Sequence, residues 1–341
     1  MTPRERVLRA IQFQDTDMVP YHVTSTKDAR AKLADYYGDP DFESKIGNHI
    51  AYLYRGGEGV WTDLQPGYVQ DAWGVVWNRT VDKDIGCVEN RILPEASLKG
   101  WQPPSVDAER LNGILRERAA AEPDRFRVVS LGFSLFERAW TLRGMEQLLM
   151  DMIESPGFVH ELFDRITQYN LGFIDIALRH DIDCLRFGDD WGSQAGLIMG
   201  PRLWREFIKP RIARMYARVR SARKYVMIHS CGKVQEVFPD LVEVGLNVFN
   251  PFQPEVMDVF ETKKRYYGKL SFFGGISVQR LLPLGTPEEV RSVTRRLLEI
   301  LGKGGGYIAS PSHDIPSDVP AENMAAMIEV LQSQKPGAWV L

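Results

Sequence analysis

Apolar residues recur every three or four positions in several segments of the chain, the spacing that places them on one face of an α-helix. Thr2-Pro3-Arg4-Glu5 and Thr286-Pro287-Glu288-Glu289 each place an N-cap threonine before a helix-starting proline, with Glu three residues after the threonine. This arrangement is a capping box and predicts that a helix begins at each site. The second predicted helix ends at Gly302 and carries one apolar face: Val290, Val293, Leu297 and Leu301.

Two further helices are predicted from the same spacing. One begins at Ser155-Pro156 and the other lies near the end of the sequence. Their expected inward faces are Val159, Leu162, Phe163 and Ile166 in the first, and Met324, Met327, Ile328 and Leu331 in the second. We interpret these faces as core, because an apolar face at helical spacing is buried in a globular protein.

Short apolar runs lie between the predicted helices and are typical of buried strands. They are Met18–Val23, Val128–Leu131, Cys184–Phe187, Val226–Ile228, Val248–Phe249, Leu270–Phe273 and Tyr307–Ala309. In the second half of the chain they alternate with helices, which indicates parallel βαβ units. An eighth strand would lie between about residues 50 and 100, a region rich in Gly, Trp and Tyr. The predicted fold is therefore an α/β, (β/α)8 TIM barrel in one domain spanning 1–341, with about 24–100 partly an insertion.

Composition and charge narrow the classes of partner. The chain has 341 residues, 44% of them hydrophobic and 26% charged, with a formal net charge of −3. This balance, without a basic stripe, argues against nucleic-acid binding. No run of eighteen apolar residues predicts a membrane span, and no apolar run behind the first residues predicts a secretory signal. The three cysteines, Cys87, Cys184 and Cys231, are too few and too scattered for a disulfide framework, so we expect a cytoplasmic protein.

Polar residues follow directly after six of the predicted strands. The segments are Gly132-Phe133-Ser134, Asp189-Asp190-Trp191, His229-Ser230-Cys231-Gly232, Asn250-Pro251-Phe252-Gln253, Gly274-Gly275 and Ser310-Pro311-Ser312-His313-Asp314. In a (β/α)8 barrel the C-terminal ends of the strands form the catalytic face. We therefore predict the active site there, with Phe133, Trp191, Asn250 and Gln253 contacting a small-molecule substrate.

His229 and Cys231 form a candidate metal site. In an extended segment residues i and i+2 point the same way, and imidazole and thiolate are ligands that Zn²⁺ favours. His313 is the candidate third ligand, with Asp314 beside it to orient the ring. The alternatives are a buried cysteine beside a hydrogen-bonded histidine, and a His313 that caps a helix or bonds to its loop.

Asp189 and Asp190 are the candidate catalytic residues. Two adjacent carboxylates at the mouth of a barrel suit a metal ligand, a substrate anchor or a general base. The alternative is that they cap the loop and helix that follow. Trp61, Trp73, Trp77 and Phe133 are candidates for an aromatic pocket, although core residues would give the same pattern.

Four of these motifs together resemble the uroporphyrinogen decarboxylase superfamily. They are Thr2 to Val7 leading to Asp17-Met18-Val19-Pro20, His229-Ser230-Cys231-Gly232, Gly274-Gly275-Ile276, and the stretch from Pro311 to Asn323. The superfamily consists of (β/α)8 barrels. It includes metal-free porphyrinogen decarboxylases and zinc-dependent methyltransferases that work with corrinoid proteins, and the resemblance therefore implies one of these activities.

The zinc-dependent branch is the more similar in motif. It carries His-x-Cys after the fifth strand and a further Cys near the end of the chain. His229 and Cys231 match the first motif, whereas this sequence has His313 in place of the second cysteine. The porphyrinogen decarboxylases have an Arg-rich N-terminal motif and an early Asp that bind substrate. Tyr21-His22-Val23-Thr24 supplies neither, which argues against porphyrinogen decarboxylation.

The change from cysteine to histidine has a chemical consequence. A site of two histidines and one cysteine gives zinc a net charge of about +1, against about zero for one histidine and two cysteines. The metal is then a stronger Lewis acid, which favours removing a methyl group from oxygen over methylating a thiol. The chain lacks Asp-x-His-x-x-Gly, the motif by which corrinoid proteins hold their cofactor. A separate corrinoid protein is therefore the expected partner.

The leading hypothesis is a zinc-dependent methyltransferase or demethylase that moves a methyl group between a small O- or S-methyl substrate and a corrinoid protein. One alternative is a lyase or decarboxylase acting on a small carboxylated or cyclic substrate, with an Asp as acid and base. Another is a non-catalytic ligand-binding barrel. Metal content separates the first hypothesis from the other two.

Overall fold

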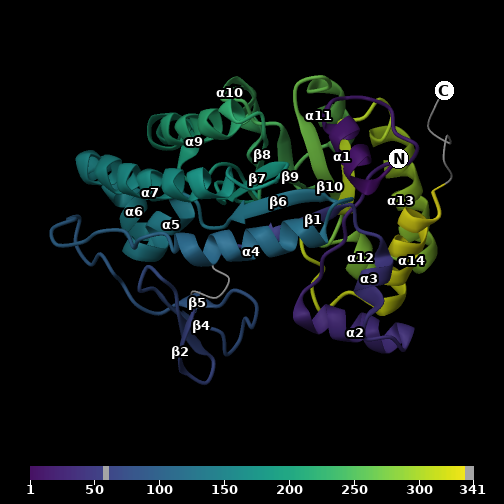
Figure 1. Ribbon diagram of the computed structural model, residues 1–341, viewed down its shortest axis with the longest axis horizontal. Helices are drawn as coiled ribbons and strands as arrows, with labels where there is room; N and C mark the ends of the chain where they lie inside the picture. Colours follow the sequence, from purple (N-terminus) through teal and green to yellow (C-terminus); the bar gives the residue numbers. More distant parts are fainter. Residues whose placement is uncertain (57–60, 335–341) are drawn as a thin grey trace. The chain divides into compact units, whose positions relative to one another are not determined.

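The computed structural model describes residues 1–56 and 61–334 of this α/β protein. In this part of the chain seven strands form a parallel sheet in the order β1-β6-β7-β8-β9-β10-β11 (Figure 1). The strands are β1 (Ile50–Tyr54), β6 (Phe126–Leu131), β7 (Cys184–Gly188), β8 (Tyr225–His229), β9 (Val248–Phe252), β10 (Ser271–Ile276) and β11 (Tyr307–Pro311). β1 lies where an eighth strand was expected, and six other predicted strands are confirmed. A closed barrel of eight strands stays a prediction.

The chain divides into two compact units. The first contains residues 1–51, 122–127 and those described from 247 onward, and the second contains the described residues of 52–121 together with 128–246. Within the first unit β10 pairs in parallel with both β9 and β11. Its helices are α1 (Pro3–Ile11), α2 (Lys27–Tyr37), α3 (Phe42–Ile46), α11 (Val259–Arg265), α12 (Leu281–Leu284), α13 (Pro287–Leu301) and α14 (Ala321–Gln332).

The second unit contains parallel strands and a separate antiparallel sheet. β7 pairs with β8 and with the second-unit part of β6. Four short strands form the antiparallel sheet: β2 (Thr62–Gln65), β3 (Tyr68–Gln70), β4 (Val76–Asn78) and β5 (Cys87–Val88). The helices are α4 (Ala108–Ala121), α5 (Phe136–Arg143), α6 (Met145–Glu154), α7 (Pro156–Ala177), α8 (Gly200–Leu203), α9 (Lys209–Ser221) and α10 (Phe238–Glu243), with a π-helical turn at Trp204–Ile208 and a 3₁₀ turn at Gln235–Val237. That the antiparallel sheet is an insertion on a barrel stays a prediction.

The predicted strand at Met18–Val23 forms an isolated bridge instead of a regular strand. Tyr21 pairs with Ala309 of β11, and the Ala309 N–H donates to the Pro20 carbonyl at 2.8 Å. On the other side the His49 N–H donates to the Tyr21 carbonyl at 3.0 Å. Pro20 has no N–H to donate, and the Val23 N–H bonds to the Asn48 side chain at 2.7 Å. The ladder is therefore interrupted at both ends.

The helix predictions agree with the structure except at one position. Both capping boxes are present, at Thr2 and at Thr286, and the predicted apolar faces of α7 and α14 are buried. In α13, however, Val293 is 38% exposed, whereas Thr294 is fully buried. The buried face of this helix runs through Val290, Thr294, Leu297, Leu298 and Leu301. Val293 lies beside that face, so its assignment to the core was wrong.

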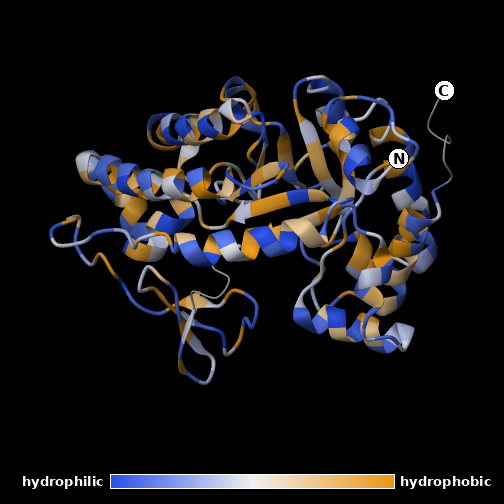
Figure 2. Ribbon diagram, viewed as in Figure 1, coloured by the Kyte–Doolittle hydropathy of each residue, from blue (hydrophilic) through white to orange (hydrophobic). Residues whose placement is uncertain are grey.

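Burial follows hydropathy in the elements that carry the site. All six residues of β6 are buried, and Figure 2 shows this strand mostly in orange, whereas α4 alternates between blue and orange. A strand buried on both faces reads as a continuous apolar run, which is why the sequence located it. Among the described residues no helix is both long and apolar enough to cross a membrane.

A buried histidine links the N-terminal helix to the segment before β1. His49 is 2% exposed; its Nε2 lies 3.3 Å from Nη1 of Arg6, and its Nδ1 accepts the Tyr21 N–H at 3.4 Å. Arg6 is held by Asp17, whose Oδ1 accepts from Nε at 2.7 Å. Burial, followed by the positive charge of Arg6, lowers the pKa of His49 to about 4. His49 is therefore neutral in the folded protein at pH 7.

This pKa makes stability depend on pH in a defined window. The unfolded histidine has a pKa of about 6.5, so the unfolded chain binds more protons between that value and about 4. The free energy of unfolding should therefore fall as the pH is lowered from about 6.5 to about 4, by at most about 3 kcal/mol from this residue. His49→Gln should remove this part of the pH dependence. Urea unfolding across the window measures it, and an unchanged slope in the variant would contradict the assignment.

Candidate functional site

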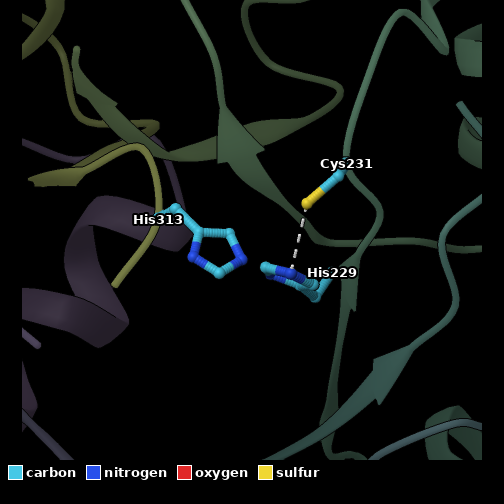
Figure 3. A group of neighbouring side chains, drawn as sticks. All are labelled: His229, Cys231 and His313. Carbon is cyan, nitrogen blue, oxygen red and sulfur yellow. Dashed lines mark hydrogen bonds between the residues drawn. The ribbon is translucent and has the colours of Figure 1, made fainter. Parts of the chain in front are cut away.

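The predicted His-x-Cys pair lies at the end of β8, within the second unit. His229 is the last residue of the strand and Cys231 follows two residues later. Nε2 of His229 and Sγ of Cys231 are 3.5 Å apart, and Figure 3 shows the two side chains directed toward each other. Gly232, at φ +86°, then turns the chain so tightly that a Cβ there would lie 2.4 Å from the Gly192 carbonyl carbon. Glycine is required at this turn.

The spacing of the two donor atoms fits a shared zinc ion. Zinc binds imidazole nitrogen at about 2.0–2.1 Å and thiolate sulfur at about 2.3 Å in tetrahedral geometry, which places the two donors about 3.6 Å apart. The observed separation is 3.5 Å. Both side chains are half-buried, so the pair is sheltered and remains accessible.

Acidic groups surround the thiol. Oδ1 of Asp190 accepts the backbone N–H of Cys231 at 2.8 Å. Burial, followed by the negative charge of Asp190, raises the pKa of the Cys231 thiol well above its usual range. Glu137 adds to the same effect. Thiolate formation here requires a compensating positive charge, because a buried anion beside carboxylates is strongly disfavoured.

Glu137 is a candidate functional residue that the sequence reasoning missed. It lies in the first turn of α5 and is half-buried. Burial, followed by the charges of Asp190 and Asp189, raises the pKa of Glu137 well above its usual range. The polar segment considered after β6 ended at Ser134, three residues too early. A Glu in the first turn of the helix after a parallel strand was the available signal.

Asp189 is fully buried, and its carboxylate accepts hydrogen bonds from backbone and indole N–H groups. Its Oδ1 accepts the backbone N–H groups of Leu135 at 3.2 Å and Glu137 at 2.8 Å. Its Oδ2 accepts the indole N–H of Trp191 at 2.5 Å. Burial raises the pKa of Asp189 to about 6, against the lowering effect of these hydrogen bonds. The carboxylate thus holds the start of α5, and its predicted catalytic role stays a prediction.

The remaining predicted residues are distributed over both units. In the second unit, Trp191 is fully buried against Trp204, and Phe133 lines a cavity. In the first unit, Asn250 is 7% exposed and donates to the Phe273 carbonyl at 3.0 Å. Gln253 is buried one residue after β9, and His313 is exposed two residues after β11. The second unit therefore brings together Asp189, Asp190, Trp191, His229 and Cys231, and the substrate-binding roles stay predictions.

Comparison with known proteins identifies the family. The model of the uroporphyrinogen decarboxylase (URO-D) family matches residues 87–334, which include the site described above. The chain belongs to the uroporphyrinogen decarboxylase family. The resemblance predicted from the motifs is confirmed, and the family match extends to the end of the described residues.

Relatives and a solved structure agree with this membership. Uroporphyrinogen decarboxylases of two Coxiella burnetii strains, Dugway 5J108-111 and RSA 493 / Nine Mile phase I, are each 20% identical over 191 residues, or 53% of this chain and 49% of the relative. The chain thus spans about half the length of these curated relatives. A methyltransferase from Methanosarcina mazei is 18% identical, covers 97% of this chain and 98% of its own, and superposes with a TM-score of 0.72. That protein shares the fold.

The hydrogen bonds of the two aspartates predict different effects of the same substitution. In Asp189→Asn the amide nitrogen would face either the Trp191 indole N–H or the two backbone N–H donors. A buried donor without an acceptor costs about 1–3 kcal/mol, so the melting temperature should fall by several degrees. Asp190→Asn is the matched control, because its amide oxygen can still accept the Cys231 N–H. Thermal unfolding of both variants tests this, and equal melting temperatures would contradict a structural role for Asp189.

Proposed function

We propose that this protein is an enzyme, a zinc-dependent methyltransferase or demethylase that moves a methyl group between a small O- or S-methyl substrate and a corrinoid protein. The observation that carries the proposal is the 3.5 Å approach of His229 Nε2 to Cys231 Sγ at the end of β8. Imidazole and thiolate at this spacing suit zinc. The fold shared with a protein named as a methyltransferase, and membership of the family, support the same reaction class.

His313 is proposed as the third ligand. It is supported by its place two residues after β11 and by its imidazole, a ligand that zinc favours. Two histidines and one thiolate leave a fourth position for substrate in a catalytic zinc site. Zinc bound by this set would act as a Lewis acid toward the oxygen of a methyl ether.

The neighbouring acids have separate proposed roles. Asp190 holds the backbone N–H of Cys231 and so fixes the orientation of the turn that carries the thiol. Burial, followed by the charges of Asp190 and Asp189, raises the pKa of Glu137 well above its usual range, which favours its protonated form. When a methyl group leaves an oxygen, that oxygen gains a pair of electrons and must be protonated. We assign this proton to the Glu137 carboxyl, which becomes a carboxylate in the step.

The corrinoid is proposed to come from a separate protein, since the sequence lacks the corrinoid-binding histidine motif. We also propose that the sheet closes into a (β/α)8 barrel. In the first unit the segment around Tyr21 bonds to β11 on one side and to His49, the residue before β1, on the other. This is the position of the missing strand of such a barrel.

A decarboxylase is the second candidate. It is favoured by the names of the curated relatives and by the three acidic residues Glu137, Asp189 and Asp190 in one unit. A carboxyl whose pKa is raised by neighbouring carboxyl groups suits acid and base catalysis without a metal. Metal content distinguishes the two candidates.

The first test is the metal itself. Protein purified without chelator should contain about one zinc per chain. His229→Ala, Cys231→Ser and His313→Ala should each lower the zinc content severalfold, because three protein ligands are needed to hold a catalytic zinc. His180→Ala and Cys87→Ser are matched controls outside the site and should retain the metal. Elemental analysis measures this, and zinc-free wild-type protein that cannot be reconstituted would favour the decarboxylase.

The second test is the proton donor. Zinc-loaded protein should transfer a methyl group from an O-methyl substrate to cob(I)alamin. The absorbance change of the cobalamin measures the reaction. Glu137→Gln should lower kcat by about 10²–10⁴-fold while zinc content and melting temperature stay near those of the wild type. A variant with full activity would remove Glu137 from the mechanism. Absence of transfer by zinc-loaded wild type across a panel of methyl ethers and thioethers would contradict the proposed function.

A further inference from the structure

The second unit contains a cavity of about 290 Å³ that lies apart from the His229–Cys231 turn. It is bounded by the residues after β1, the loop after β6, and helices α4 and α7. Six aromatic side chains contribute to its walls: Tyr54, Trp61, Trp73, Phe133, Tyr169 and Phe173. A cavity of this size is at the lower end of the range for small-molecule sites, which suits a ligand with one ring.

The aromatic rings are held in fixed positions by their neighbours. Trp73 meets Tyr169 edge to face, with ring centroids 4.7 Å apart, and its backbone N–H donates to Asp71 at 2.9 Å. Phe133 packs on the fully buried Trp77 at 5.2 Å. The φ of Phe133 is +49°, a conformation that a bulky residue rarely adopts. Strain of this kind persists where the surroundings impose it, and here it accompanies a ring that lines the cavity.

Three arginines contact the cavity and differ in how they are paired. Arg138 is buried and its Nη1 donates to Asp71 at 2.7 Å, so its charge is already compensated. Arg55 and Arg110 are exposed, and within residues 1–56 and 61–334 neither forms an ion pair with a carboxylate. Asp107 also lines the cavity, where its Oδ1 accepts the Arg110 backbone N–H at 3.0 Å. The cavity therefore combines aromatic side chains and a buried Arg138–Asp71 pair with two exposed guanidinium groups.

We propose that this cavity binds a single-ring aromatic carboxylate. The ring lies among Trp61, Trp73 and Phe133, where edge-to-face and offset contacts with aromatic side chains favour a planar ligand. The carboxylate lies at the exposed side, where Arg110 or Arg55 donates charge-assisted hydrogen bonds.

The loop after β6 connects this cavity to the acidic site. Phe133 lines the cavity, and two and four residues later the N–H groups of Leu135 and Glu137 donate to Asp189. The aromatic acid is therefore assigned as the methyl-bearing substrate, and this assignment rests on the proposed function. Binding in the cavity needs neither the metal nor turnover.

The binding test uses three probes that separate the ring from the charge. Benzoate has both, cyclohexanecarboxylate has the charge without the aromatic ring, and benzyl alcohol has the ring without the charge. Calorimetric titration of the full-length protein should give a Kd for benzoate at least about tenfold lower than for either of the others. The same preference should persist after zinc is removed with a chelator. Benzoate binding no tighter than that of cyclohexanecarboxylate would overturn the proposal.

Variants locate the site. Arg110→Gln should weaken benzoate about tenfold and leave benzyl alcohol unchanged, while Arg116→Gln, on the same helix but outside the cavity, should change neither. Phe133→Leu should weaken the binding of both probes that contain a ring, benzoate and benzyl alcohol. If Phe133→Leu also lowers the melting temperature, Trp61→Leu, at a half-buried position, repeats the test. Benzoate affinity unaffected by Arg110→Gln and Trp61→Leu would place binding elsewhere and overturn the assignment. Normal benzoate binding with no methyl transfer from any methoxy-substituted benzoate would contradict the proposed function and leave the cavity assignment intact.

Discussion

The buried carboxylate of Asp189 holds together the parts of the second unit that matter for chemistry. It has no exposed surface, so each of its oxygens needs a protein donor. The backbone of α5 supplies two donors and the Trp191 indole supplies the third. As a result, the helix that carries Glu137 is fixed relative to the end of β7, and Asp190, the next residue, is directed to the turn that carries Cys231. Two adjacent aspartates thus position the helix that carries Glu137 and the turn that carries the Cys231 thiol.

The charges of this region bear on the proposed metal ion. The charges of Asp190 and Asp189 disfavour ionisation of Glu137. The charges of Asp190 and Glu137 likewise disfavour ionisation of the Cys231 thiol. Elsewhere in the unit a buried acid is compensated by a side chain: Arg138 pairs with Asp71 at 2.7 Å. The positive charge of Arg186 lowers the pKa of the Cys231 thiol, but burial and the two acids outweigh it. The proposed divalent ion, bound by imidazole and thiolate, would add positive charge beside these groups.

The sequence predicted those features that depend on burial on two faces or on local capping. β6 to β11 appear as continuous apolar runs, and the threonine caps of α1 and α13 are local. The antiparallel sheet β2–β5 could not be found in this way, because β2 is exposed along its whole length and β3 is half-buried throughout. Glu137 was missed for a different reason. The helix dipole by itself favours a Glu in the first turn of a helix, so this position does not indicate a functional residue. The proximity of Glu137 to Asp190 becomes visible only once α5 and β7 are placed together.

Two tryptophans show how residues of the same type can serve either the core or the cavity. Trp77 and Trp73 lie four residues apart in one Trp-rich segment. Trp77 is 1% exposed, donates its indole N–H to Asp71 at 3.2 Å and packs against Phe133, so it supports the wall of the cavity from behind. Trp73 is half-buried, bonds to the same aspartate through its backbone, and presents its ring to the cavity. Asp71 therefore fixes both tryptophans and, through Arg138, the helix α5 that also bears Glu137. The aspartate that orients the two tryptophans is thus bonded to the helix that bears the proposed proton donor, and this contact links the aromatic wall to the acidic site.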